Sequence, residues 1–146
     1  MRGISALAIV VGGVCDVVLS GVLGVSLVIY AVSSRSLGQL PKDQLQGAVV
    51  AAIHGAPALY AIQLAIGFGC SMLGGFIAAS IAKQRRLLNG VLASWLCVAV
   101  GVYSLLTGQS SEPVPVHLAF IAVTPLCYLG GAWLRLKLSG TSSATV

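Results

Sequence analysis

Charge is the scarcest property of this sequence. Only 8% of its 146 residues are charged, and only 3 of them are acidic, whereas about a quarter of the residues in an ordinary soluble domain carry a charge. Hydrophobic residues make up 58% of the chain, and the mean hydropathy is +1.01. This composition excludes an ordinary water-soluble domain and predicts a protein whose surface faces lipid.

The sequence also lacks the motifs of common active sites. It contains no phosphate-binding glycine loop, no nucleophile triad, no paired catalytic carboxylates and no haem-attachment motif. The 4 cysteines show no Cys-x-x-Cys spacing, and His54 and His117 have no third ligand at a recognisable spacing. We therefore predict no metal site and no cofactor, and nothing in the sequence argues for an enzyme.

Four long apolar stretches make up most of the chain. A helix needs about 17 to 25 residues to cross the hydrocarbon layer of a bilayer, and each stretch is of that length or longer. Lipid offers no partner to a backbone polar group, so a span is either a helix or a strand of a closed barrel, and the stretches show no barrel-like alternation. We predict an all-α bundle of four transmembrane helices in residues 1–138, with spans at about 4–32, 55–82, 87–107 and 116–134 and a flexible tail at 139–146.

The cations gather at one end of the predicted spans. Only Arg35 and Lys42 lie at the other end. An excess of basic residues marks the cytoplasmic side of a membrane protein, so both termini and the cluster between the second and third spans should be cytoplasmic. We interpret this cluster as a topology determinant that can also contact anionic lipid, and we predict no nucleic-acid partner. The six cations at the cytoplasmic end are Arg2, Lys83, Arg85, Arg86, Arg135 and Lys137.

An acidic residue, Asp16, lies near the middle of the first stretch. A charge at that depth costs from about 2.5 to more than about 10 kcal/mol, so we expect its carboxyl group to be neutral or turned toward polar partners inside the bundle. Small and polar residues recur at four-residue intervals before and after Asp16 and form a stripe along the helix. The second span carries a similar stripe. Such stripes allow helices to approach closely. The residues predicted to pack helices in this way are Gly12, Ser20, Gly24, Gly67 and Gly75.

Depth along the spans indicates partners for Asp16. Counting from the predicted cytoplasmic ends places Ser71 of the second span and Thr124 of the fourth at its level. Pro125 adds another acceptor, because a proline inside a helix leaves the carbonyl group of Ile121 without its usual donor. We therefore predict an intramembrane polar site of Asp16, Ser71 and Thr124. This site is either a structural hydrogen bond between helices or part of a proton or cation relay, although a relay needs a second titratable group and the sequence indicates none nearby.

Two segments of the chain are similar to each other. The second span contains CSMLGG at 70–75 and runs on to Lys83, and the fourth contains CYLGG at 127–131 and runs on to Arg135. This similarity favours two repeated helical hairpins in the same orientation.

The second span and the turn that follows it also resemble a known family. The sequence GGFIAASIAK at 74–83, followed by LNG at 88–90, resembles a pattern in small four-span bacterial membrane proteins of uncharacterised function. Asp16 is similar to an acidic residue in the first span of those proteins, whereas Ser80 stands where they often have an arginine. The resemblance implies a four-span protein of the bacterial inner membrane and supplies no activity.

Two main interpretations of function follow. In the first, the chain is a non-enzymatic inner-membrane protein that packs through its small-residue faces against a second copy or a partner membrane protein. In the second, it is a small proton-linked transporter or channel subunit in which Asp16 changes protonation. An enzyme acting on lipid-soluble substrates is a third alternative, and no motif favours it.

Overall fold

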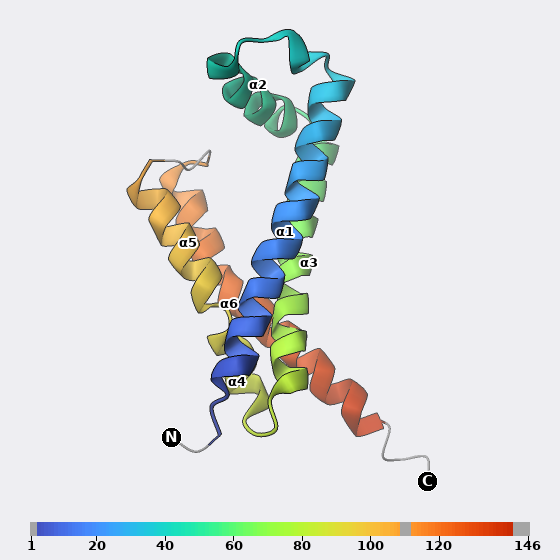
Figure 1. The fold of residues 1–146 in the computed structure, drawn as a ribbon, viewed down its shortest axis with the longest axis vertical. Helices are drawn as coiled ribbons and strands as arrows, with labels where there is room; N and C mark the ends of the chain where they lie inside the picture. Colours follow the sequence, from blue (N-terminus) through green and yellow to red (C-terminus); the bar gives the residue numbers. More distant parts are fainter. Residues whose placement is uncertain (1–2, 109–111, 142–146) are drawn as a thin grey trace. The chain divides into compact units, whose positions relative to one another are not determined.

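The computed structural model describes residues 3–108 and 112–141 of the chain (Figure 1). Arg2 and residues 142–146 of the predicted tail lie outside the described residues. Within the described part the chain forms helices and no strands. The elements are α1 (Ala6–Ser34), the 3-10 helix η1 (Leu37–Gln39), α2 (Lys42–His54), α3 (Pro57–Ile81), α4 (Arg86–Leu92), α5 (Trp95–Leu106) and α6 (Val114–Thr141).

Four helical segments are long and apolar enough to cross a membrane, one of them made of α4 and α5 together. They are Ala6–Ser34, Pro57–Ile81, Arg86–Leu106 and Val114–Ser139, which confirms the predicted all-α, four-span architecture. The last helix is longer than expected: α6 continues to Thr141, so residues 139–141 of the predicted tail are helical.

The third span is divided into α4 and α5 by a tighter turn at Ala93 and Ser94. The amide of Ser94 donates to the carbonyl oxygen of Val91 at 3.0 Å, and the Ser94 hydroxyl group donates to the same oxygen at 2.7 Å. Bonds from a residue to the third residue before it belong to a 3-10 turn. The α-helical pattern is therefore interrupted within this span.

The chain separates into two compact units, which we call the bundle unit and the loop unit. The bundle unit comprises Met1–Val18 and Phe68–Val146, and the loop unit comprises Leu19–Gly67. The loop unit contains the second half of α1, η1, α2 and the first part of α3. Its core is formed by Leu27 and Ala31 of α1 against Val49 and Ile53 of α2.

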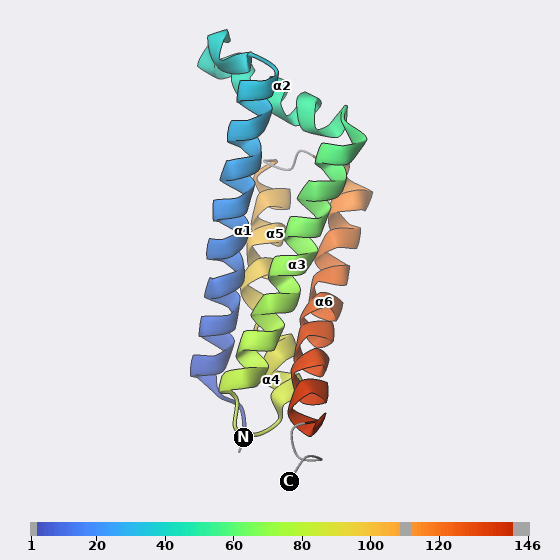
Figure 2. The same cartoon turned by 90° about the vertical axis from the view of Figure 1, so that its right-hand side faces the viewer.

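Within the bundle unit, α6 packs against both α4 and α5 (Figures 1 and 2). Its contact with α3 depends on two glycines. A Cβ atom added to Gly75 would collide with the backbone carbonyl group of Tyr128, and one added to Gly131 would collide with that of Met72. The two Leu-Gly-Gly segments of the similar sequence stretches thus contain the points where α3 and α6 approach backbone to backbone.

Small residues also bring α1 and α3 together. A Cβ atom added to Gly12 would lie only 2.7 Å from the carbonyl oxygen of Gly74 and 2.8 Å from Cβ of Ala78. Both Ala78 and Ala79 are fully buried. The pattern GGFIAASIAK therefore contains the residues that form the packing face of α3.

A buried amide ties the start of the chain to the turn between α3 and α4. The side chain of Asn89 accepts a hydrogen bond from the Ser5 amide at 2.8 Å. Its Nδ2 donates to the carbonyl oxygens of Gly3, Gln84 and Arg85 at 3.1, 2.9 and 3.1 Å. This contact stabilises the basic turn against the segment that leads into α1.

Candidate functional site

The candidate site is a polar cluster around Asp16 inside the bundle unit. Asp16 is only 3% exposed, as expected for an acid within a membrane span. Its Oδ2 atom accepts hydrogen bonds from the hydroxyl group of Ser71 at 3.0 Å, from the thiol of Cys97 at 3.1 Å and from the hydroxyl group of Tyr128 at 2.7 Å. The four residues belong to α1, α3, α5 and α6, so one carboxylate oxygen links all four spans.

Two of these partners also contact each other. The Cys97 sulfur lies 3.4 Å from the Tyr128 hydroxyl oxygen, and either group can donate. Tyr128 is fully buried and packs in a cluster with Ala78 and Ala93. The hydroxyl group of Tyr128 thus reaches Asp16 from a ring that is fixed by apolar contacts.

A glycine makes room for this meeting of side chains. A Cβ atom added to Gly74 would lie 2.9 Å from the carbonyl oxygen of Gly12, 3.0 Å from Cε1 of Tyr128 and 3.1 Å from Cβ of Asp16. These distances are shorter than normal carbon contacts. The close approach of α1, α3 and α6 and the convergence of donors on Asp16 therefore depend on the same glycine-rich surface.

The chemistry of the site follows from this donor set. An ionised carboxylate is an acceptor only, whereas Ser, Tyr and Cys can each donate. Each hydrogen bond contributes about 0.5 to 1.5 kcal/mol, and hydrogen bonds to a charged group contribute more. Three convergent donors can stabilise a carboxylate away from water, and two of them, Cys97 and Tyr128, are themselves titratable.

The structure brings together only part of the predicted polar site. Ser71 contacts Asp16, but Thr124 does not: its hydroxyl group donates to the carbonyl oxygen of Phe120 in its own helix at 2.8 Å. The three donors on Asp16 are side chains, and the carbonyl group of Ile121 is not one of its contacts. The position on α6 next to Asp16 is taken by Tyr128, one turn beyond Thr124.

The predicted packing residues fall into two groups. Gly12 and Gly75 lie at tight helix contacts in the bundle unit. Ser20, Gly24 and Gly67 belong to the loop unit, where Ser20 is half-buried and a Cβ atom added to Gly24 or Gly67 would have no described atom within 4 Å.

The histidines lie apart from the polar cluster. His117 makes a 2.9 Å hydrogen bond to the carbonyl oxygen of Gly101, and His54 packs edge-on against the ring of Tyr60. Among residues 3–108 and 112–141, no three His, Cys, Asp or Glu side chains gather in a way that could hold a metal ion.

The basic cluster forms the turn between α3 and α4. Lys83 and Arg85 are exposed, and Arg85 adopts a left-handed backbone conformation with φ of 46°. Arg86 donates from Nε to the carbonyl oxygen of Ala82 at 3.2 Å. On the neighbouring α6, Arg135 donates to the hydroxyl group of Ser80 at 2.9 Å.

Sequence reasoning did not identify Cys97, Tyr128 or Asn89 as polar contacts. Nothing in the sequence distinguishes Cys97 or Tyr128 from core residues, because a cysteine and a tyrosine inside an apolar span are commonly buried for packing alone. The depth count started from Leu134 and stopped at Thr124, whereas α6 continues to Thr141 and the contact with Asp16 comes from Tyr128, four residues beyond Thr124.

Comparison of the chain with family models, curated proteins and solved structures found no match.

Proposed function

We propose that this protein is a non-enzymatic protein of the bacterial inner membrane that acts by packing against a second copy of itself or against a partner membrane protein. The observation that carries the proposal is that two stripes of small residues are each packed against other helices along only half of their length. The stripe on α1 runs through Gly12, Asp16, Ser20 and Gly24. Its first half is packed in the bundle unit, whereas half-buried Gly24 of the loop unit has no described atom within 4 Å of an added Cβ.

The stripe on α3 supports the same proposal. Ser71, Gly75 and Ala79 are buried in the bundle unit, but Gly67 of the loop unit is exposed, with open space beside it. Glycine in a membrane helix allows another backbone to approach closely, and such faces are a common basis of helix association in lipid. The open half of each stripe is the surface that we assign to a partner helix.

An unsatisfied amide lies on the open half of the α3 stripe. Within the described part of the chain, Oε1 of Gln63 is buried and has no hydrogen-bond partner. Such a group costs about 1 to 3 kcal/mol. Side-chain amides form hydrogen bonds between helices in membranes, so a donor on a partner helix would remove this cost once the Gln63 side chain turned outward from its buried position.

The distribution of charge supports an orientation with both termini in the cytoplasm. The turn between α3 and α4 carries three cations, and Arg135 of α6 contacts Ser80 near the end of α3. Basic residues therefore concentrate at one end of the bundle unit, as the positive-inside rule requires for a cytoplasmic face.

Energy transfer between donor-labelled and acceptor-labelled copies in liposomes tests self-association. We expect transfer in the wild type and about tenfold weaker association for Gly67→Leu, because a leucine would hold the partner backbone away. Gly69→Leu is the matched control: Gly69 is also exposed with no described atom within 4 Å of an added Cβ, but it lies on the opposite side of α3. If both variants self-associated as strongly as the wild type does, the face assigned to the partner helix would be wrong. Cross-linking of the same two variants in native membranes tests whether this face binds a partner membrane protein.

One observation favours the second interpretation, a proton-linked transporter or channel subunit that uses Asp16. A relay needs a second titratable group, and Cys97 and Tyr128 both donate to the carboxylate of Asp16. Proton flux through the reconstituted protein separates this alternative from an assembly function.

A further inference from the structure

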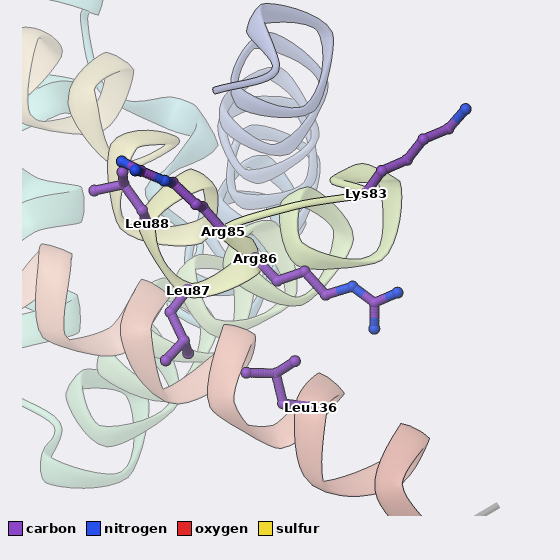
Figure 3. Close-up of a pocket in the computed structure, with 6 residues that line it drawn as sticks. All are labelled: Lys83, Arg85, Arg86, Leu87, Leu88 and Leu136. Atoms are coloured by element: carbon purple, nitrogen blue, oxygen red, sulfur yellow. The ribbon is translucent and has the colours of Figure 1, made fainter. Parts of the chain in front are cut away.

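The basic turn between α3 and α4 lines a shallow pocket of about 580 Å³ (Figure 3). Figure 3 shows that Lys83 and Arg86 extend to one side of the turn, that Arg85 extends to the other, and that Leu87 and Leu136 face each other from α4 and α6. The pocket therefore combines long cationic side chains with an apolar wall from two helices. Its lining residues are Lys83, Arg85, Arg86, Leu87, Leu88 and Leu136.

Among the described residues, no acidic side chain lines this pocket. The chain contains only 3 acidic residues, Asp16, Asp43 and Glu112. The carboxylate of Asp16 is buried and accepts three hydrogen bonds within the bundle. Asp43 lies in the first turn of α2, Glu112 precedes α6 at the end opposite Leu136, and neither lines the pocket. The positive charge of the pocket is thus available to an external anion.

The arrangement of Arg86 also suits an anion. Its Nε donates to the carbonyl oxygen of Ala82, which positions the guanidinium group while its terminal nitrogens carry further N–H donors. A guanidinium group binds phosphate oxygens through its paired donors, and the ammonium group of Lys83 adds a mobile point charge.

The place of the pocket identifies the anion. It lies at the junction of the second and third membrane spans, next to the last part of the fourth. Basic clusters at the ends of membrane helices attract anionic headgroups, and the leucine wall suits the apolar part of a lipid better than a free ion. We propose that this pocket binds an anionic phospholipid of the surrounding bilayer, with Lys83 and Arg86 contacting the phosphate and Leu87 and Leu136 contacting the apolar part.

Native mass spectrometry of the full chain in micelles with equimolar phosphatidylglycerol and phosphatidylcholine tests this site. We expect the wild type to retain phosphatidylglycerol preferentially. Lys83→Gln and Arg86→Gln should each weaken that retention about fivefold, which corresponds to about 1 kcal/mol for each cation near the headgroups. The side chain of Lys83 is exposed, so Lys83→Gln tests the site even if Arg86→Gln disturbs the turn.

Two further variants decide whether the effect belongs to this pocket and to a lipid. Arg35→Gln removes the same charge from a residue that does not line the pocket and should leave retention unchanged. Leu136→Asn keeps every cation and should weaken retention, because an apolar contact is lost. An equal loss in Arg35→Gln, an unchanged Leu136→Asn variant, or no preference for phosphatidylglycerol in the wild type would each overturn the proposal.

Discussion

Replacing Gly75 or Gly131 by alanine is expected to lower the free energy of unfolding by about 3 kcal/mol. In each case the added methyl group would meet backbone atoms of the facing helix, those of Tyr128 for Gly75 and those of Met72 for Gly131. A backbone cannot turn aside as a flexible side chain can, so α3 and α6 would have to separate. Reversible unfolding in mixed micelles with increasing SDS measures the change.

Two other glycines of the same two helices, Gly130 of α6 and Gly69 of α3, provide matched controls for this prediction. A Cβ atom added to Gly130 would lie 3.8 Å from the end of the Met72 side chain, and one added to Gly69 would have no described atom within 4 Å. Gly130→Ala and Gly69→Ala should therefore leave stability unchanged or raise it by up to about 1 kcal/mol, because alanine favours a helix over glycine. A loss of the same size in Gly130→Ala and Gly131→Ala would show that the contact between α3 and α6 is not the cause.

Replacing Asp16 by alanine is expected to cost about 3 kcal/mol in the same unfolding measurement. The substitution removes the acceptor shared by Ser71, Cys97 and Tyr128, and it leaves the buried Tyr128 hydroxyl group with only the weak sulfur partner of Cys97. A buried donor without an acceptor costs about 1 to 3 kcal/mol, and the lost side chain leaves a cavity that adds to this cost.

Asp16→Asn separates the lost acceptor from the lost charge, and Asp43→Ala is the control for loss of an exposed acid. Asp16→Asn keeps an oxygen that can accept the same hydrogen bonds. It should therefore lower the free energy of unfolding by less than about 1 kcal/mol, the difference between hydrogen bonds to a charged and to a neutral acceptor. Asp43→Ala removes an exposed acid from the first turn of α2 and should cost only about 0.3 to 1 kcal/mol. If Asp16→Ala were as mild as Asp43→Ala, the polar cluster would not hold the four helices together.

The architecture could be predicted from sequence because lipid imposes strong limits on it. Apolar stretches of sufficient length must form spans, and the spans must be helical. The residues that mark the end of a helix are less distinctive than an apolar stretch, so the end of α6 was placed too early. Its polar residues from Ser139 resemble a tail by composition, yet the helix continues through them to Thr141.

The candidate site was predictable at its centre and in one of its three partners, Ser71. A buried acid within a span is conspicuous, and Asp16 with Ser71 followed from stripe and depth. Cys97 and Tyr128 carry no comparable signal, because their polar atoms become important only when four helices bring them to one oxygen. Asn89 is similar: its four backbone contacts depend on the fold of a turn and of the segment before α1.

The most direct test of the account is proton flux into liposomes that contain the purified protein, under an imposed membrane potential. If Asp16 joins the helices and the protein acts by assembly, wild type and Asp16→Asn should both show the flux of protein-free liposomes. Flux in the wild type that is lost in a folded Asp16→Asn variant would contradict this account and identify Asp16 as the centre of a proton pathway.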